Sequence, residues 1–263
     1  MKPTEKLFEE IKELANNLNN QGWSEKNAGN FSIRMEKSLR PVHSFPHEME
    51  QVVPHLGDQT LLCSVSGSRM PDIYKIPEQN ICYVTFNHEG NSYAVTNANK
   101  TAIRDKSPTS ELSTHALIHD TLIANKKDER VVLHSHPTEI IALTQIPLFK
   151  SEETINELLT GMHPESSLFI PEGIGFVPYQ ITGSDQLATL SMEKIGSHRT
   201  LIWEKHGSLS IGKNLTEAFD LLTIVSKCAS IFFMVRQAGY EPEGLSKDQL
   251  EELRKIQWKY KNI

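Results

Sequence analysis

Cysteine is scarce in this sequence, which has only Cys63, Cys82 and Cys228 among its 263 residues. Their number is odd and their spacing is wide, so they form neither a disulfide framework nor a Cys-x-x-Cys metal site. A small secreted domain held together by disulfides is therefore excluded, and any metal ligands must be sought among other residue types.

The sequence also lacks a long apolar run and an excess of basic residues. Its longest apolar run covers residues 228–235 and lies between Lys227 and Arg236, which predicts a buried helix segment rather than a membrane span. The N-terminus begins with charged residues in an amphipathic pattern and not with a signal peptide. The formal net charge of -6 argues against nucleic acid as the main partner. We therefore expect a cytoplasmic protein with no membrane or nucleic-acid partner, in which a local pocket can still bind a small anion.

The length and the 38% hydrophobic content are ordinary for a soluble enzyme and predict one domain over residues 1–263. Apolar periodicity predicts helices over residues 1–20, 107–124, 151–159 and 216–238 and a last helix that begins at Ser246, where Gln249 completes a capping box. Extended stretches are predicted over residues 31–34, 59–65, 81–86, 92–95, 130–135 and 200–204. The proline-rich segment 38–55 is predicted to be irregular. This mixture predicts an α/β or α+β fold.

A His-Ser-His triplet ends the predicted strand over residues 130–135. Residues two apart on a strand point to the same face, so His134 and His136 are expected to project together. Paired imidazoles can hold a metal ion, but they can also be polar residues at an exposed strand end. The triplet alone leaves these two interpretations about even.

A third histidine, His206, follows another apolar segment and precedes a glycine. Three histidine ligands leave a tetrahedral ion one open position, which is typical of catalytic rather than structural zinc sites. The chain has eleven histidines, however, so spacing alone does not show that His206 meets the pair.

Glu111 is predicted to lie in the first turn of the helix that begins near Ser107. A carboxylate there is favoured by the helix dipole, but it could also act as an acid/base beside a metal or as a fourth ligand. His115 and His119 follow at four-residue steps on the same face. They could be ligands as well, although packing along a partly buried helix is the favoured interpretation.

Three further segments could contact a substrate. Residues 27–32 and 64–68 are rich in small and polar residues and could form anion-binding nests, although each alone is more typical of a turn. Residues 171–175 place Glu172 on a glycine-rich loop, for which composition favours a surface turn. A Schiff-base mechanism would need a lysine in an apolar pocket, and Lys205 is expected to point away from His206.

Taken in order, these segments resemble the class II sugar-phosphate aldolases. The resemblance extends from Trp23 to Ala229 and rests on the following motifs: Asn27-Ala28-Gly29-Asn30-Phe31-Ser32, Ser66-Gly67-Ser68, Pro108-Thr109-Ser110-Glu111-Leu112, residues 131–137, Pro171-Glu172-Gly173-Ile174-Gly175 and His206-Gly207.

The resemblance implies a three-layer α/β fold with a central, mainly antiparallel sheet between helices, assembled as a homotetramer. It implies one zinc ion (Zn2+) per subunit on His134, His136 and His206, with Glu111 as the catalytic acid/base. It also implies that Glu172 acts at a neighbouring subunit's site. The residues expected around a substrate phosphate are Asn27, Gly29, Asn30, Ser66, Gly67 and Ser110.

The implied reaction is the zinc-dependent retro-aldol cleavage of a phosphorylated ketose, L-rhamnulose 1-phosphate, to dihydroxyacetone phosphate and L-lactaldehyde. L-Fuculose 1-phosphate cleavage and pentulose-phosphate 4-epimerisation use the same step and remain alternatives. Outside this class, the chain could be a non-catalytic interaction module or a zinc hydrolase.

Overall fold

The computed structural model describes residues 3–39, 45–97 and 106–259. Within these residues the strands form one nine-stranded sheet in the order β2-β5-β4-β3-β1-β6-β9-β8-β7. Every pairing in it is antiparallel except that of β7 with β8. The strands are β1 (Asn30–Arg34), β2 (Pro46–Glu48), β3 (Thr60–Ser64), β4 (Ile81–Phe86), β5 (Ser92–Thr96), β6 (Val131–Ser135), β7 (Gly175–Val177), β8 (Thr200–Trp203) and β9 (Gly207–Gly212).

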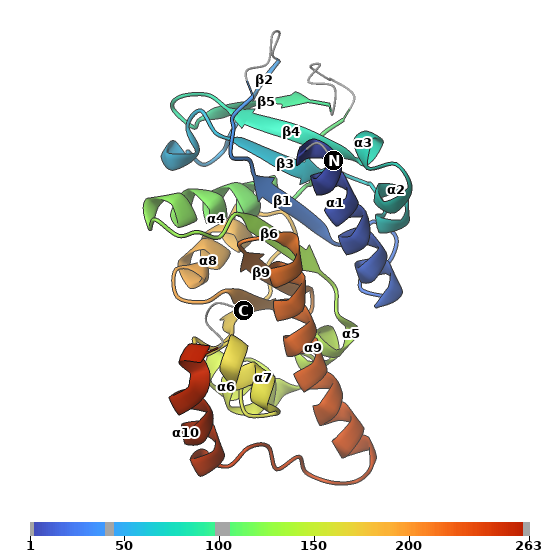
Figure 1. Cartoon of the computed structure of the whole chain (residues 1–263), viewed down its shortest axis with the longest axis vertical. Coiled ribbons are helices and arrows are strands. Elements are labelled where there is room, and N and C mark those ends of the chain that lie inside the picture. Colours follow the sequence, from blue (N-terminus) through green and yellow to red (C-terminus); the bar gives the residue numbers. More distant parts are fainter. Residues whose placement is uncertain (1–2, 40–44, 98–105, 260–263) are drawn as a thin grey trace.

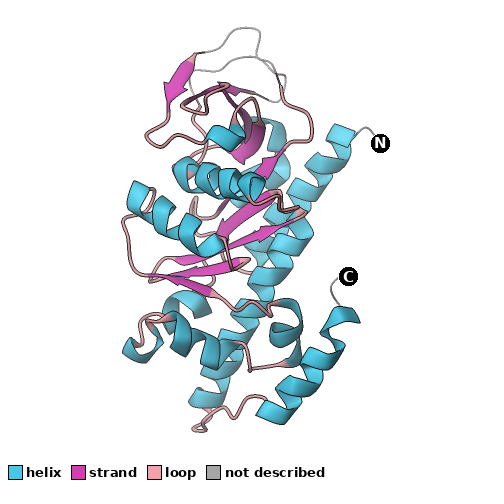
Figure 2. Cartoon of the chain, turned by 90° about the vertical axis from the view of Figure 1, so that its left-hand side faces the viewer, coloured by secondary structure: helices cyan, strands magenta, loops and turns pink. Residues whose placement is uncertain are grey.

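Helices cover both faces of this sheet, as Figures 1 and 2 show. The described α-helices are α1 (Pro3–Asn20), α2 (Met70–Lys75), α3 (Pro77–Asn80), α4 (Leu112–Ala124), α5 (Thr138–Leu143), α6 (Glu152–Leu159), α7 (Pro164–Phe169), α8 (Asp185–Ile195), α9 (Leu215–Gln237) and α10 (Lys247–Ile256). In the same described part of the chain, short 3-10 turns cover Pro54–Leu56, Pro147–Phe149 and Gln257–Lys259. The expected mixed α/β fold with a large, mainly antiparallel sheet is confirmed.

Strand alternation divides the core between the two faces. On β6, Val131 and Leu133 pack with α1 and the start of α9, whereas Val132 packs with α4 and α8. The apolar stripe of α1, which includes Ile11 and Leu14, is buried against the first of these faces. His134 has the same strand parity as Val132 and therefore faces the α4 side.

Helix α9 is the one described helix that is long and apolar enough to cross a membrane, and 44% of that apolar window is buried within the protein. Cys228, Ala229 and Phe232, from the apolar run noted above, are buried in a core cluster with residues of α5, α6 and β7. Asn214 caps the helix by accepting a hydrogen bond from the backbone N–H of Glu217.

Most predicted elements are present, including the capping box of Ser246 and Gln249 before α10. The predicted helix start near Ser107 is wrong, because Pro108 pairs with Val65 and the N–H of Thr109 donates to the carbonyl of Ser64. These sheet-like bonds keep the segment extended, and α4 begins only at Leu112. Within segment 38–55, residues 46–48 form β2, and residues 40–44 lie outside the described residues.

Candidate metal centre and its surroundings

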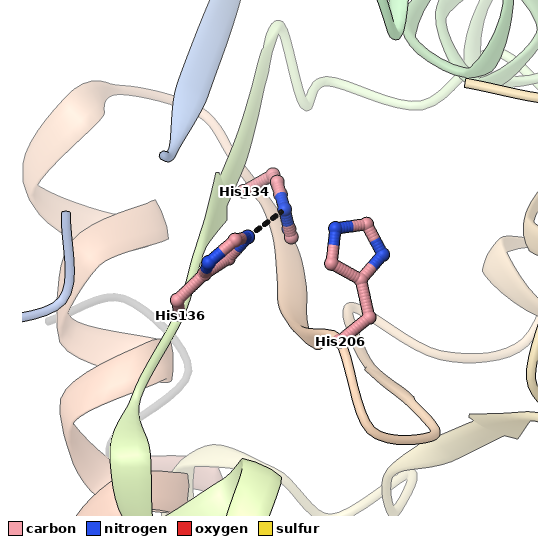
Figure 3. A group of neighbouring side chains, drawn as sticks. All are labelled: His134, His136 and His206. Carbon is pink, nitrogen blue, oxygen red and sulfur yellow. Dashed lines mark hydrogen bonds between the residues drawn. The ribbon is translucent and has the colours of Figure 1, made fainter. Parts of the chain in front are cut away.

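The structure brings His134, His136 and His206 together, with one ligand atom from each lying within 4.8 Å of the others. Figure 3 shows the three rings facing a common space. His134 is on β6, His136 lies one residue beyond that strand, and His206 lies in the turn between β8 and β9. The sequence did not predict β9, which is the strand that brings this turn to the end of β6.

The β8–β9 turn fits closely against β6. Lys205 adopts a φ of 58°, and the N–H of His206 donates to the carbonyl of Trp203 across the turn. A Cβ atom on Gly207 would lie 2.4 Å from the carbonyl oxygen of Ser135, so only glycine allows this approach. The ring of Trp203 lies 4.4 Å from that of His134 and 5.0 Å from that of His206, between centroids.

Hydrogen bonds fix the tautomers of two of these histidines. Nδ1 of His134 lies 2.8 Å from the carbonyl oxygen of Ser208, and Nδ1 of His136 lies 2.7 Å from Oε1 of Glu25. A carbonyl or carboxylate oxygen can only accept, so both Nδ1 atoms carry the hydrogen. In a neutral ring with this tautomer the Nε2 atom presents a lone pair, and the two Nε2 atoms are only 3.1 Å apart.

Burial disfavours an additional proton on two of the three rings. Burial holds the pKa of His134 well below its usual value, and it lowers the pKa of His206 to about 3, with a further contribution from His134. Neutral imidazoles facing one another are the donor set that a bound cation satisfies. Figure 3 shows Nε2 of His206 facing the other two rings, whereas its Nδ1 faces away from them and is buried without a hydrogen-bond partner among the described residues. The three residues therefore fit zinc.

Glu111 lies beside these rings. Its Oε1 is 3.6 Å from Nε2 of His206, and its Oε2 is 3.8 Å from Nε2 of His134. The carboxylate is buried and accepts a hydrogen bond of 2.9 Å from Nδ2 of Asn30. Glu111 occupies the N-cap position of α4, and its side chain makes no capping bond. Its predicted place in the first helical turn is wrong, and its carboxylate points toward the histidines instead.

The segments expected to bind a phosphate are held next to Glu111. The Val65–Pro108 bridge and the bond from Ser66 N–H to the Ser107 carbonyl join the two serine-containing loops. Asn27, Ser66, Gly67 and Ser110 are exposed, whereas Gly29 is buried against the backbone of His134 and Ser135. Asn30 already uses both ends of its amide, since its Oδ1 lies 2.6 Å from Nε2 of His115. Phosphate binding by these residues stays a prediction.

Glu172 lies between α7 and β7, where Nε of Arg199 donates to its Oε1 at 2.7 Å. Arg199 also donates to Glu217 and to the carbonyl of Phe169. Glu172 is thus held by an ion pair within its own chain, and its role at a neighbouring subunit stays a prediction. Lys205 lies on the turn between β8 and β9, and its partly exposed ammonium group lies 3.8 Å from Glu204.

Sequence reasoning missed three contributors to this region. Glu25 and the carbonyl of Ser208 orient two of the histidines, and Ser32 contacts both His115 and His119. Only Ser32 had a local signal, because it shares strand parity with Asn30. His115 and His119 are fully buried and lie outside the three-histidine cluster, in agreement with the packing interpretation.

A family model, relatives and solved structures that resemble this chain agree with one another. A model of the class II aldolase and adducin N-terminal domain matches residues 9–233. A rhamnulose-1-phosphate aldolase of Bacteroides thetaiotaomicron is 28% identical over 257 residues, covering 94% of this chain and 93% of that protein. A sugar-phosphate aldolase from Thermotoga maritima superposes with a TM-score of 0.77 at 28% identity, covering 92% of this chain and 99% of that one. An L-fuculose 1-phosphate aldolase, at 18% identity, has a TM-score of 0.64 with 95% of each chain covered and shares the fold.

Proposed function

Because this chain belongs to the class II aldolase and adducin N-terminal domain family, we propose that it is a zinc-dependent aldolase that cleaves L-rhamnulose 1-phosphate to dihydroxyacetone phosphate and L-lactaldehyde. The substrate assignment rests on the rhamnulose-1-phosphate aldolases that resemble the chain over most of its length. The main support for the proposed chemistry is the 3.1 Å distance between Nε2 of His134 and Nε2 of His136, beside the buried carboxylate of Glu111.

His134, His136 and His206 would hold the zinc ion. Bound there, zinc would supply Lewis-acid polarisation of the ketose carbonyl, which favours the negative charge that develops when the carbon–carbon bond breaks. Neutral imidazole ligands leave the ion its full positive charge, whereas carboxylate ligands would reduce it.

Glu111 would act as the acid/base. Cleavage takes the proton from the hydroxyl group of the carbon that becomes the aldehyde and leaves an electron pair on the carbon that becomes part of dihydroxyacetone phosphate. That second carbon must receive a proton, so in net terms one proton moves from oxygen to carbon. The carboxyl group of Glu111 would hold this proton, and the Asn30 bond to its Oε2 keeps its orientation fixed. Both oxygens lie within 4 Å of a histidine nitrogen of the metal cluster, so the proton carrier and the cation would act on neighbouring atoms of one substrate.

The exposed polar groups next to Glu111 would bind the phosphate end of the substrate. Ser66, Gly67 and Ser110 come from loops that are bonded together, and Asn27 and Gly29 lie on the segment before β1. Nδ2 of Asn30 has a second hydrogen beyond the one donated to Glu111, so it can contribute as well. Glu172 would assist at the aldehyde end of a neighbouring subunit's site.

We further infer that residues 1–263 act as one catalytic domain, that the enzyme is a homotetramer, and that it works in the cytoplasm. One family model that matches residues 9–233 supports the single domain. The resemblance supports the tetramer, because a site that uses Glu172 of a neighbour requires assembly. Sedimentation velocity would test the assembly, since a monomer with full activity would contradict it.

The deciding assay is cleavage of L-rhamnulose 1-phosphate coupled to reduction of dihydroxyacetone phosphate, with L-fuculose 1-phosphate as the matched alternative. We expect activity that a chelator removes and added zinc restores, with the rhamnulose substrate preferred. Equal or better cleavage of the fuculose substrate would overturn the substrate assignment. Activity that persists after complete metal removal would overturn the mechanism.

A further inference from the structure

A line of buried and half-buried side chains connects the interior of the protein to Glu111. Asn30 and Ser32 project from β1 toward α4, and Glu111, His115 and His119 project back at four-residue steps. Four helical residues rise about 6 Å and two strand residues about 6.6 Å. The two spacings nearly match, so the side chains interleave as a ladder in the order Glu111, Asn30, His115, Ser32, His119.

Each step of this ladder is a short hydrogen bond. Asn30 Nδ2 lies 2.9 Å from Glu111 Oε2, and His115 Nε2 lies 2.6 Å from Asn30 Oδ1. Ser32 Oγ lies 2.7 Å from Nδ1 of His115 and 2.8 Å from Nε2 of His119. Both histidine side chains are fully buried.

The acceptors determine the direction of every bond. The carboxylate of Glu111 accepts from the Asn30 NH2 group, so the Asn30 carbonyl faces His115 and accepts from its Nε2–H. Burial lowers the pKa of His115 to about 4, so its ring is neutral and its Nδ1 is an acceptor. Ser32 therefore donates to His115 and accepts from Nε2–H of His119. Nδ1 of His119 is left as a lone pair, consistent with its having no partner among the described residues.

All donors in this ladder point toward Glu111, but the ladder does not conduct protons. The amide of Asn30 interrupts it, and an amide has no titratable proton to pass on. The ladder can instead prevent Asn30 from rotating. A rotated amide would place its carbonyl against the carboxylate and its NH2 group against the N–H of His115, and both contacts would be repulsive.

We propose that His115, supported by Ser32 and His119, is a positioning residue that fixes the Asn30 amide so that one N–H always holds the Glu111 carboxylate in its catalytic orientation. This rests on the proposed function of Glu111 as the acid/base. His115 would touch neither substrate nor metal and would act only through Asn30.

Two variants separate positioning from packing. His115→Leu removes the donor to Asn30, whereas His115→Gln keeps an N–H close to the position of Nε2. We expect His115→Leu to lower kcat about tenfold, as is typical when a supporting partner is lost, with KM and zinc per chain unchanged. His115→Gln should recover most of that loss. Thr114→Val is the control, since Thr114 is buried on the same helix and its hydroxyl has no partner among the described residues.

A kcat of His115→Leu within twofold of wild type, or equal losses in the leucine and glutamine variants, would overturn the proposal. A second measurement does not depend on activity or on stable variants. Nitrogen-15 spectra of the imidazoles in the unmodified chain should show His115 and His119 protonated only at Nε2, and protonation of His115 at Nδ1 would refute the ladder. If the wild-type chain cleaves no phosphorylated ketose, the proposed function fails by itself, and the imidazole spectra alone decide the ladder.

Discussion

Nε2 of His134 and Nε2 of His136 lie 3.1 Å apart, although hydrogen bonds to Ser208 and Glu25 leave a lone pair on each. Two lone pairs at this distance repel one another unless a positive charge lies between or beside them. A cation bound between the two rings would relieve this repulsion, so zinc binding tests the metal centre without any assay of turnover.

His136→Ala should abolish stoichiometric zinc binding, because the remaining two histidines cannot hold the ion tightly. Metal analysis after dialysis gives the measurement, with about one zinc per wild-type chain expected from a three-histidine site. The control is His163→Ala. His163 resembles His136 in exposure (14% against 17% of the side chain) and also places its Nδ1 2.7 Å from a glutamate, but it lies outside the cluster. Full zinc content in His136→Ala would remove it from the ligand set.

Glu25→Gln should weaken zinc affinity about 10- to 100-fold, because Glu25 fixes the tautomer and orientation of His136. The Glu25 side chain is 65% exposed, so little change in folding stability is expected. Competition with a fluorescent chelator measures the affinity. Glu165→Gln removes the equivalent partner of His163 and should leave zinc affinity unchanged. Equal affinities for wild type and Glu25→Gln would show that Ser208 and β6 orient the cluster without it.

Much of this arrangement could be predicted from local sequence patterns. Strand alternation placed His134 and His136 on one face, and apolar periodicity located α1, α9 and α10. The proximity of His206 could not be predicted in this way, because it depends on β9 pairing with a strand some 75 residues earlier in the sequence. The segment of β9 reads Gly-Ser-Leu-Ser-Ile-Gly, whose small residues give a weak strand signal. Glu25 lies in a loop, where no periodicity marks a partner of a distant histidine.

Glu111→Gln should retain zinc and reduce turnover by about 10²- to 10⁴-fold, the range typical of a lost general acid/base. Glutamine keeps the shape of the side chain and still accepts from Asn30 through its carbonyl oxygen, so the loss would reflect the missing proton carrier. Cleavage rates and zinc content are measured on the same preparation. Near-normal turnover would exclude Glu111 from proton transfer, and loss of zinc would make it a ligand.

The metal-free chain should lose stability as pH falls below about 6.5. Burial lowers the pKa of His115 to about 4 and that of His119 well below its usual 6.5. Between pH 6.5 and these lowered pKa values, the unfolded chain binds more protons than the folded chain, so acid favours unfolding. The stability that the neutral histidines contribute is therefore complete only above pH 6.5. For His115 this corresponds to about 3 kcal/mol. Urea unfolding between pH 7.5 and 4.5 measures it. His115→Gln should have a shallower pH dependence, and an unchanged slope would contradict the assignment.

Glu172→Ala should slow cleavage without loss of zinc, and the ion pairs of Arg199 provide a control for its structural effect. Arg199 contacts Glu172 at 2.7 Å and Glu217 at 3.3 Å, and the two carboxylates are similarly exposed. If Glu172 only anchors Arg199, then Glu217→Ala should impair the enzyme in the same way. If Glu172 assists at a neighbouring site, its removal should lower kcat at least tenfold more than removal of Glu217, while both variants lose comparable melting temperature. Equal kinetic losses would assign Glu172 a structural role, because removal of either carboxylate partner of Arg199 would then have the same effect on catalysis.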